Sequence, residues 1–290
     1  MMVHRNSAVE PVMSALKALS QSHPAAITRR EVTLAAKPEP LAARIYAAEG
    51  VGKSPILVMH LHGGTFNDGS LETGEAVATV LARAGAAVVS IAYPLAPEHR
   101  FPDVLEAAFG GLEAVYKNRG RWAAKGAPLY VAGEEAGGNL AAALAMMARD
   151  RQGPPLAGQI LLSPMLDACL GTYSFRAADA GPVGCRWADG WHDYLGSPDK
   201  AAHPYAAPLG ASRLAGLAPA LLITAEDDLM RDETADYGRR LQEAGVPVHF
   251  HVQPAPSNWP EAYAEGVKEG SCLCLARDHV SKFYEFTAPS

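Results

Sequence analysis

Cysteine is scarce in this chain. Only four of the 290 residues are cysteines, and their spacings are not those of a zinc site or a redox pair, since Cys272 and Cys274 form only a C-x-C. The chain also lacks an unbroken apolar run of about 18 residues, and residues near its start lack an apolar segment of signal-peptide length. We therefore expect reduced thiols, no metal or cofactor, no membrane span and a cytoplasmic location.

A strong excess of one charge is also lacking. The chain has 25 Lys and Arg against 31 Asp and Glu, a net charge of −6 and a pI near 5.9. This balance argues against nucleic acid or an anionic membrane surface as the main partner. Hydrophobic residues make up 49% and charged residues 19%, as in a globular protein with a large core.

Short apolar runs alternate with helical patterns along the chain. The runs that predict strands are 27–34, 41–48, 55–60, 86–91, 129–133, 159–163, 220–224 and 246–252. Helical spacing is found over 8–21, about 70–83, 101–118, the segment after the fifth strand up to 147, 189–195, 232–244, 261–270 and 273–286. This alternation predicts a single α/β domain over residues 1–290, with a mostly parallel sheet of about eight strands and helices on both faces.

The run Leu129–Gly133 leads into a glycine-rich turn and then an Ala/Leu-rich helix. Its sequence, Gly133-Glu134-Glu135-Ala136-Gly137, has the strand–turn–helix context of a nucleophile elbow, G-x-S-x-G. Glycines suit such a turn because larger side chains would collide across the bend. Where the elbow would present serine, this chain has Glu135.

Several blocks together resemble the hormone-sensitive-lipase-like bacterial esterases, an α/β-hydrolase family, over roughly residues 40–260. The blocks stand in family order, and each is close to a motif of that family. The block His62-Gly63-Gly64-Thr65-Phe66 resembles H-G-G-G-F, and the segment from Tyr93 to Pro102 resembles Y-R-L-A-P-E-H-x-F-P. The segment from Gly133 to Ala141 resembles G-D-S-A-G-G-N-L-A, and the segment from Thr224 to Glu233 resembles T-A-G-x-D-P-L-R-D-E. The resemblance implies an α/β-hydrolase fold with a cap, contributed by residues 1–40 and about 166–217.

The resemblance also assigns positions to the family's Ser-Asp-His triad and oxyanion hole. The serine position is Glu135, the acid is Asp228 with Asp227 as an alternative, and the histidine position is Asn258, or Ser257 or Trp259 if the alignment slips by one. Between His251 and His279 the chain has no histidine. The oxyanion-hole donors would be the backbone N–H groups of Gly63, Gly64 and Ala136.

These substitutions leave several functional hypotheses. The first is a family member without serine-esterase catalysis that keeps a pocket for a small acyl or apolar ligand, with the Glu135 carboxylate folded into the oxyanion hole. The second is an enzyme that uses Glu135 as a general base for an elimination, a dehydration or an unusual hydrolysis. Residual ester hydrolysis and a structural role in a complex are the remaining two.

Two further features keep more than one interpretation. Five aromatic residues of the 170–200 region either line an apolar ligand site or form the core of the cap itself: Tyr173, Phe175, Trp187, Trp191 and Tyr194. The strand predicted at 246–252 would lie at a sheet edge and support a homodimer.

Overall fold

The computed structural model of the protein describes residues 26–50, 52–177, 182–257 and 271–288. Its centre is one sheet of eight strands in the order β1-β2-β4-β3-β5-β6-β7-β8, in which β1 and β2 are antiparallel to their neighbours and all other pairs are parallel. The strands are β1 (Ile27–Leu34), β2 (Leu41–Ala48), β3 (Ile56–Leu61), β4 (Ala86–Ile91), β5 (Leu129–Glu134), β6 (Leu156–Leu162), β7 (Ala220–Ala225) and β8 (Val248–Gln253). The expected mostly parallel sheet of about eight strands is confirmed.

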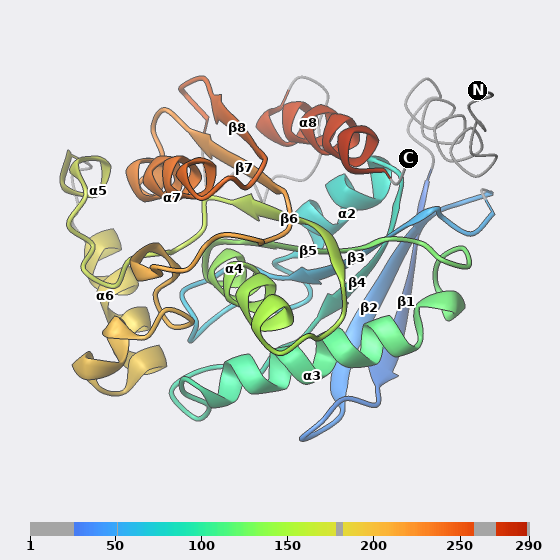
Figure 1. Cartoon of the computed structure of the whole chain (residues 1–290), viewed down its shortest axis with the longest axis horizontal. Coiled ribbons are helices and arrows are strands. Elements are labelled where there is room, and N and C mark those ends of the chain that lie inside the picture. The colour runs from blue at the N-terminus through green and yellow to red at the C-terminus, as the bar shows by residue number, and fades with distance from the viewer. Residues whose placement is uncertain (1–25, 51, 178–181, 258–270, 289–290) are drawn as a thin grey trace, which may run out of the picture.

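Helices cover both faces of this sheet (Figure 1). One face carries α3 (Asp103–Lys117), α4 (Glu135–Asp150) and α7 (Arg231–Glu243), and the other carries α2 (Glu75–Arg83) and α8 (Cys272–Thr287). The apolar side chains accordingly form two buried clusters, one on each side of the sheet. None of the helices formed by the described residues combines the length and apolar character that a membrane crossing requires.

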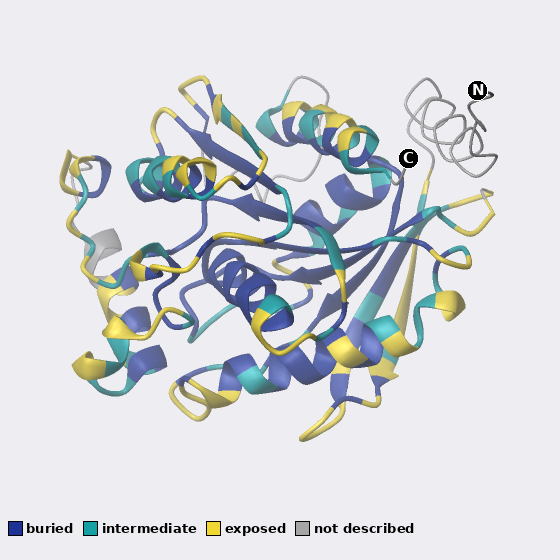
Figure 2. Cartoon of the chain, viewed as in Figure 1, coloured by how far each residue is buried: buried dark blue, intermediate teal, exposed yellow. Residues whose placement is uncertain are grey.

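Burial follows the sequence pattern of each element (Figure 2). The strands β3, β4, β5 and β7 are buried at every residue, as their continuous apolar runs predict for strands covered on both faces. The helix α4 is buried from Glu135 to Ala148, because its small residues lie directly against β3, β5 and β6. The edge strand β8 leaves Phe250 and Val252 exposed.

The segment after β6 forms a small helical cap at the carboxyl ends of the central strands (Figure 1). It contains α5 (Tyr173–Ala177), α6 (Pro182–Leu195) and the 3₁₀ turns η2 (Pro198–Ala202) and η3 (Pro208–Gly210); a further turn, η1 (Arg119–Arg121), follows α3. The helix expected at 189–195 begins earlier, at Pro182, a residue type well suited to a first helical turn. The helices expected at 8–21 and 261–270 lie outside the described residues.

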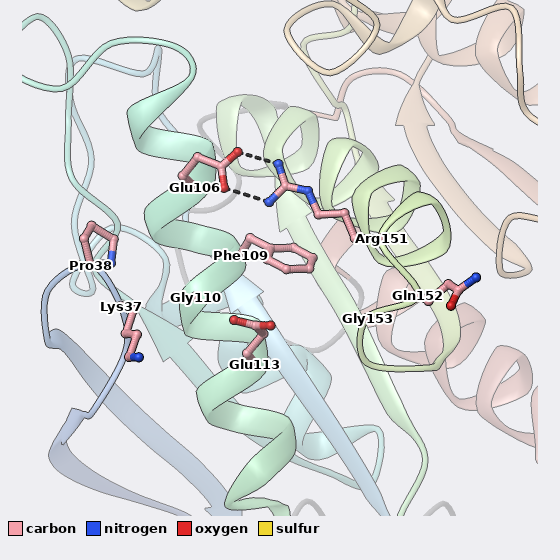
Figure 3. A pocket seen from close by; sticks show the side chains of 9 residues that line it. All are labelled: Lys37, Pro38, Glu106, Phe109, Gly110, Glu113, Arg151, Gln152 and Gly153. Carbon is pink, nitrogen blue, oxygen red and sulfur yellow. Dashed lines mark hydrogen bonds and ion pairs between the residues drawn. The ribbon is translucent and has the colours of Figure 1, made fainter.

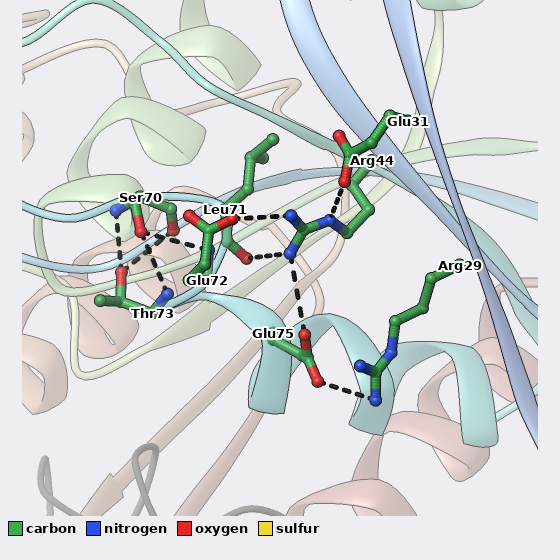
Figure 4. Close-up of polar contacts among 8 residues, drawn as sticks. All are labelled: Arg29, Glu31, Arg44, Ser70, Leu71, Glu72, Thr73 and Glu75. Atoms are coloured by element: carbon green, nitrogen blue, oxygen red, sulfur yellow. Dashed lines mark hydrogen bonds and ion pairs between the residues drawn. The ribbon is translucent and has the colours of Figure 1, made fainter.

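An ion-pair cluster joins the first hairpin to α2 (Figure 4). The guanidinium of Arg44, whose side chain is 14% exposed, lies 2.7 Å from Glu72 and 3.7 Å from Glu75, and it also bonds Glu31. Glu75 binds Arg29 of β1 at 2.8 Å. Carboxylates from three segments therefore converge on one largely buried cation, which holds the antiparallel hairpin against α2 and the turn before it.

Candidate ligand site at the turn between β5 and α4

Glu135 occupies the tight turn that joins β5 to α4. Its backbone has φ of +51°, a conformation that side-chain-bearing residues seldom adopt, and the residue is 6% exposed. The turn is closed by glycines: a Cβ at Gly133 would lie 2.3 Å from the carbonyl oxygen of Gly137. The turn therefore has the strained strand-to-helix geometry that the sequence predicts, and it presents a carboxylate.

The loop after β3 brings Gly63 and Gly64 against this carboxylate. The backbone N–H of Gly64 donates to Glu135 Oε2 at 2.7 Å. A Cβ at Gly63 would stand only 2.6 Å from the same oxygen and 2.8 Å from Glu134 Cγ, so a side chain here would force these two glutamates to shift. No described residue donates a hydrogen bond to the other carboxylate oxygen, Oε1.

Glu134, the last residue of β5, also forms a hydrogen bond with the loop after β3, which we call the glycine loop (residues 62–66). Its Oε1 accepts the N–H of Gly63 at 2.9 Å, and its Oε2 lies 2.7 Å from Nε2 of His60, whose Nδ1 lies 2.9 Å from Ser90 Oγ. All three side chains are 1% exposed or less. We call this row the Ser90–His60–Glu134 chain; it links β4, β3 and β5 beneath the glycine loop. In the sequence, this hydrogen-bond chain could have been suspected from the ionisable residues His60 and Glu134, each of which stands in an otherwise apolar strand.

The third expected donor is also engaged within the chain. The N–H of Ala136 donates to the carbonyl oxygen of Gly64 at 3.2 Å rather than to the Glu135 carboxylate. The N–H groups of Gly63, Gly64 and Ala136 therefore all have partners in the protein: Glu134, Glu135 and a backbone carbonyl.

The two adjacent aspartates after β7 have separate partners. Asp228 is 3% exposed and accepts hydrogen bonds from the hydroxyls of Ser163 and Thr224 and, at 3.0 Å, from the N–H of Met230. Asp227 instead accepts from Ser257, through its N–H at 2.8 Å and through its hydroxyl. Asn258 lies outside the described residues. The acid that holds the segment leading to position 258 is thus Asp227, the residue that the resemblance offers only as an alternative to Asp228.

Electrostatics at the turn favour the protonated acid. The pKa of Glu135 is raised from 4.5 to about 8; burial is the largest cause and the nearby carboxylates of Glu134 and Asp228 add to it, while the Gly64 N–H and the Arg186 guanidinium oppose the shift. Burial also raises the pKa of Asp228 above its usual value, against the three hydrogen bonds that favour its ionised form. A group that titrates near neutral pH in a buried turn is suited to proton transfer or to ion binding.

The helix α6 packs directly on the glycine loop. Phe66 stacks on Tyr194 at 4.1 Å between ring centroids and lies 4.9 Å from Trp191. Polar contacts tie the same surfaces, from Asn67 to Asp193 at 2.8 Å and from Arg186 to Asp68 at 3.1 Å.

The cap aromatics differ in exposure. Phe175, Trp187, Trp191 and Tyr194 are buried and belong to the large apolar cluster, whereas Tyr173 is 69% exposed. The four buried rings therefore belong to the apolar core, and two of them, Trp191 and Tyr194, contact Phe66 in the loop after β3.

A separate groove of about 660 Å³ lies on α3 and shares no lining residue with the turn (Figure 3). Its wall includes Arg151 and the exposed acid Glu113. Arg151 forms a bidentate ion pair with Glu106, and its Cζ lies 5.0 Å from the centroid of the Phe109 ring. Within the described part of the chain, no three His, Cys, Asp or Glu side chains gather closely enough to hold a metal ion.

Comparison with known proteins agrees with this architecture. A family model for the α/β-hydrolase fold matches residues 58–256. The chain is 32% identical over 197 residues to a putative α/β hydrolase of Acanthamoeba polyphaga mimivirus, covering 66% of this chain and 57% of that protein. It is 36% identical over 217 residues to the carboxylesterase NlhH of Mycobacterium tuberculosis, covering 73% of this chain and 68% of that protein.

Solved structures give the same result. The hyperthermophilic esterase of the archaeon Pyrobaculum calidifontis superposes with a TM-score of 0.79 at 31% identity, over 94% of this chain and 90% of that one. The chain spans only a little over half of the viral relative and about two thirds of NlhH. Sequence, topology and the strand-to-helix turn thus agree: the chain belongs to the hormone-sensitive-lipase-like family of α/β hydrolases.

Proposed function

We propose that this chain does not turn over esters as a serine esterase and instead binds a small molecule with an acyl or apolar part at the turn between β5 and α4. The observation that carries the proposal is the bond from the Gly64 N–H to the buried Glu135 carboxylate. In this family that N–H would serve the oxyanion of a tetrahedral intermediate, and here a side chain of the protein already occupies it.

The chemistry of the substituted positions supports the same conclusion. A serine esterase needs a hydroxyl nucleophile and a histidine that first removes and later returns a proton. Glu135 would give an anhydride on attacking an ester, and Asn258 cannot activate the water needed to resolve it. Loss of a triad costs on the order of 10⁶ in turnover, and the residual rate of about 10³–10⁴ over water depends on the oxyanion hole, which here is internally bonded.

The test is hydrolysis of short-chain p-nitrophenyl esters by the wild-type chain and by the double variant Glu135→Ser with Asn258→His. We expect the wild type to remain near the rate of water and the double variant to gain a rate that saturates with substrate. Rapid hydrolysis by the wild type would refute the proposal. Slow hydrolysis at the residual level would identify the chain as a weak carboxylic ester hydrolase.

A second candidate function is general-base catalysis by Glu135, as in a lyase, a dehydratase or an unusual hydrolase. The raised pKa of about 8 favours it, because an effective general base titrates near the working pH. Any turnover of this kind should rise with pH to a plateau above 8, and Glu135→Gln should abolish it while leaving substrate binding in place. Turnover that survives Glu135→Gln would exclude the base role.

A further inference from the structure

We propose that the ligand of this site carries an ammonium group, which the free oxygen Oε1 of Glu135 binds. This inference rests on the proposed function, since it assumes that the turn faces a ligand. It goes beyond it by assigning the sign of the charge that the ligand bears.

When Glu135 is ionised, the hydrogen-bonding inventory of the turn favours a donor or a cation over a carbonyl oxygen. The three backbone N–H groups that would receive a ligand oxygen are bonded to Glu134, Glu135 and the Gly64 carbonyl. The buried Glu135 side chain, by contrast, keeps one oxygen without a donor among the described residues. Within the described part of the chain, Oε1 is not one of the fully enclosed polar atoms that lack a partner, so it is open to a ligand at the turn, and in its ionised form it attracts a cationic N–H or N–CH₃ group.

The charged and titratable groups around Glu135 are mostly acidic. The strands supply Glu134 with its partner His60, the loops supply Asp68, Tyr93 and Asp228, and α6 supplies Arg186. The one guanidinium of this set is already paired with Asp68 at 3.1 Å, and both side chains are about half exposed, so it screens Glu135 weakly. A monovalent organic cation at Oε1 therefore lowers the repulsion among Glu134, Glu135 and Asp228.

The titration of Glu135 predicts how the affinity for a cation should change with pH. Because the pKa of Glu135 is about 8, about nine tenths of the side chains hold a proton at pH 7 and about one tenth at pH 9. A permanent cation binds the ionised form, so its affinity should rise about tenfold between these two pH values. A neutral ligand that accepts the Glu135 proton in a hydrogen bond should show the opposite trend.

The experiment is calorimetric titration with choline and with its uncharged carbon analogue, 3,3-dimethylbutan-1-ol, at pH 7 and pH 9. We expect choline to bind more tightly than the alcohol, with about a tenfold gain in affinity at pH 9. Glu135→Gln, which keeps the shape of the side chain, should remove the preference and the pH dependence while its melting temperature shows that it is folded. Glu113→Gln in the groove of Figure 3 is the matched control and should bind choline as the wild type does.

The outcomes separate the two proposals. Equal binding of both probes, or weaker choline binding at pH 9, overturns the ammonium inference and leaves the proposed ligand site standing. Choline binding that Glu113→Gln abolishes and Glu135→Gln preserves also overturns it, since the cation would then occupy the groove on α3. Rapid ester turnover by the wild type overturns the proposed function itself, and with it the reason to expect a ligand held by Glu135.

Discussion

The buried Glu135 carboxyl should make the stability of this protein fall as pH rises. Its pKa is raised from 4.5 to about 8 in the folded state, so between these values the folded chain holds a proton that the unfolded chain has lost. The stabilising contribution is complete below pH 4.5 and disappears as pH approaches 8. The slope is about 1.4 kcal/mol for each pH unit, or about 3–4 kcal/mol between pH 5 and pH 8.

The variant Glu135→Gln isolates this contribution. Its amide oxygen can still accept the Gly64 N–H, and it carries no proton that titrates in this range. The difference in free energy of unfolding, variant minus wild type, should therefore increase by about 3–4 kcal/mol from pH 5 to pH 8, because all other titrating groups cancel in the difference.

Urea unfolding at pH 5, 6.5 and 8 measures this difference. The variant Glu98→Gln changes an exposed glutamate and serves as the control, with a curve parallel to that of the wild type. A difference between Glu135→Gln and wild type that stays constant across the three pH values would refute the reasoning, because it would mean that Glu135 has an ordinary pKa in the folded protein.

Three further predictions concern the first hairpin, the loop after β3 and the pair of histidines between β8 and α8. Arg44→Met should lower the free energy of unfolding by about 1–2 kcal/mol in low salt and by less in 1 M salt, because it leaves a cluster of carboxylates without its cation. Gly63→Ala should cost about 1–3 kcal/mol, because its Cβ would press on Glu135 Oε2. His251 stacks on His279 at 3.6 Å, and its pKa is lowered to about 4 by burial and then by His279. The stabilising contribution of a neutral His251 is complete above pH 6.5 and is lost as pH falls toward 4, so His279→Gln should reduce the fall in melting temperature between pH 6.5 and 4.5.

Urea unfolding tests the first two of these and thermal unfolding at two pH values tests the third. An unchanged salt dependence in Arg44→Met would contradict the ion-pair argument. A Gly63→Ala protein as stable as wild type would mean that the carboxylate moves aside freely. An acid-induced loss of melting temperature that is the same with and without His279 would contradict coupling between the two rings.

Most of the fold could be predicted because local pattern and global architecture agree. The bounds of β1 and β2 match the predicted strands, and α7 differs from its prediction by one residue at each end. The largest shift among the described helices is α6, which begins at Pro182 instead of near residue 189. Its buried face is set by Trp187, Trp191 and Tyr194, and two of these rings, Trp191 and Tyr194, contact Phe66 only when the cap folds onto the loop after β3.

The site was less predictable because its contacts depend on side-chain direction across the sheet. The sequence places Glu135 at the turn and the glycines near it, and the structure adds the bond between Glu135 and Gly64. His60 is fully buried within an apolar strand, and the structure adds its hydrogen bonds with Glu134 and Ser90, which the strand's sequence pattern does not specify. The sequence could not show which of Asp227 and Asp228 contacts the segment that leads to position 258, because the two side chains point to different partners.

The internal bonding of the glycine loop has a consequence for chemical probes. Boronates, phosphonates and similar inhibitors of serine hydrolases place an anionic oxygen on the N–H groups of this loop and a bond on the nucleophile. Under the proposed function, the position of that anionic oxygen is filled by Glu135, which accepts the Gly64 N–H at the start of a helix whose positive end would otherwise attract the inhibitor. A survey that finds α/β hydrolases by labelling them with such reagents would therefore pass over this chain, however abundant and well folded it is.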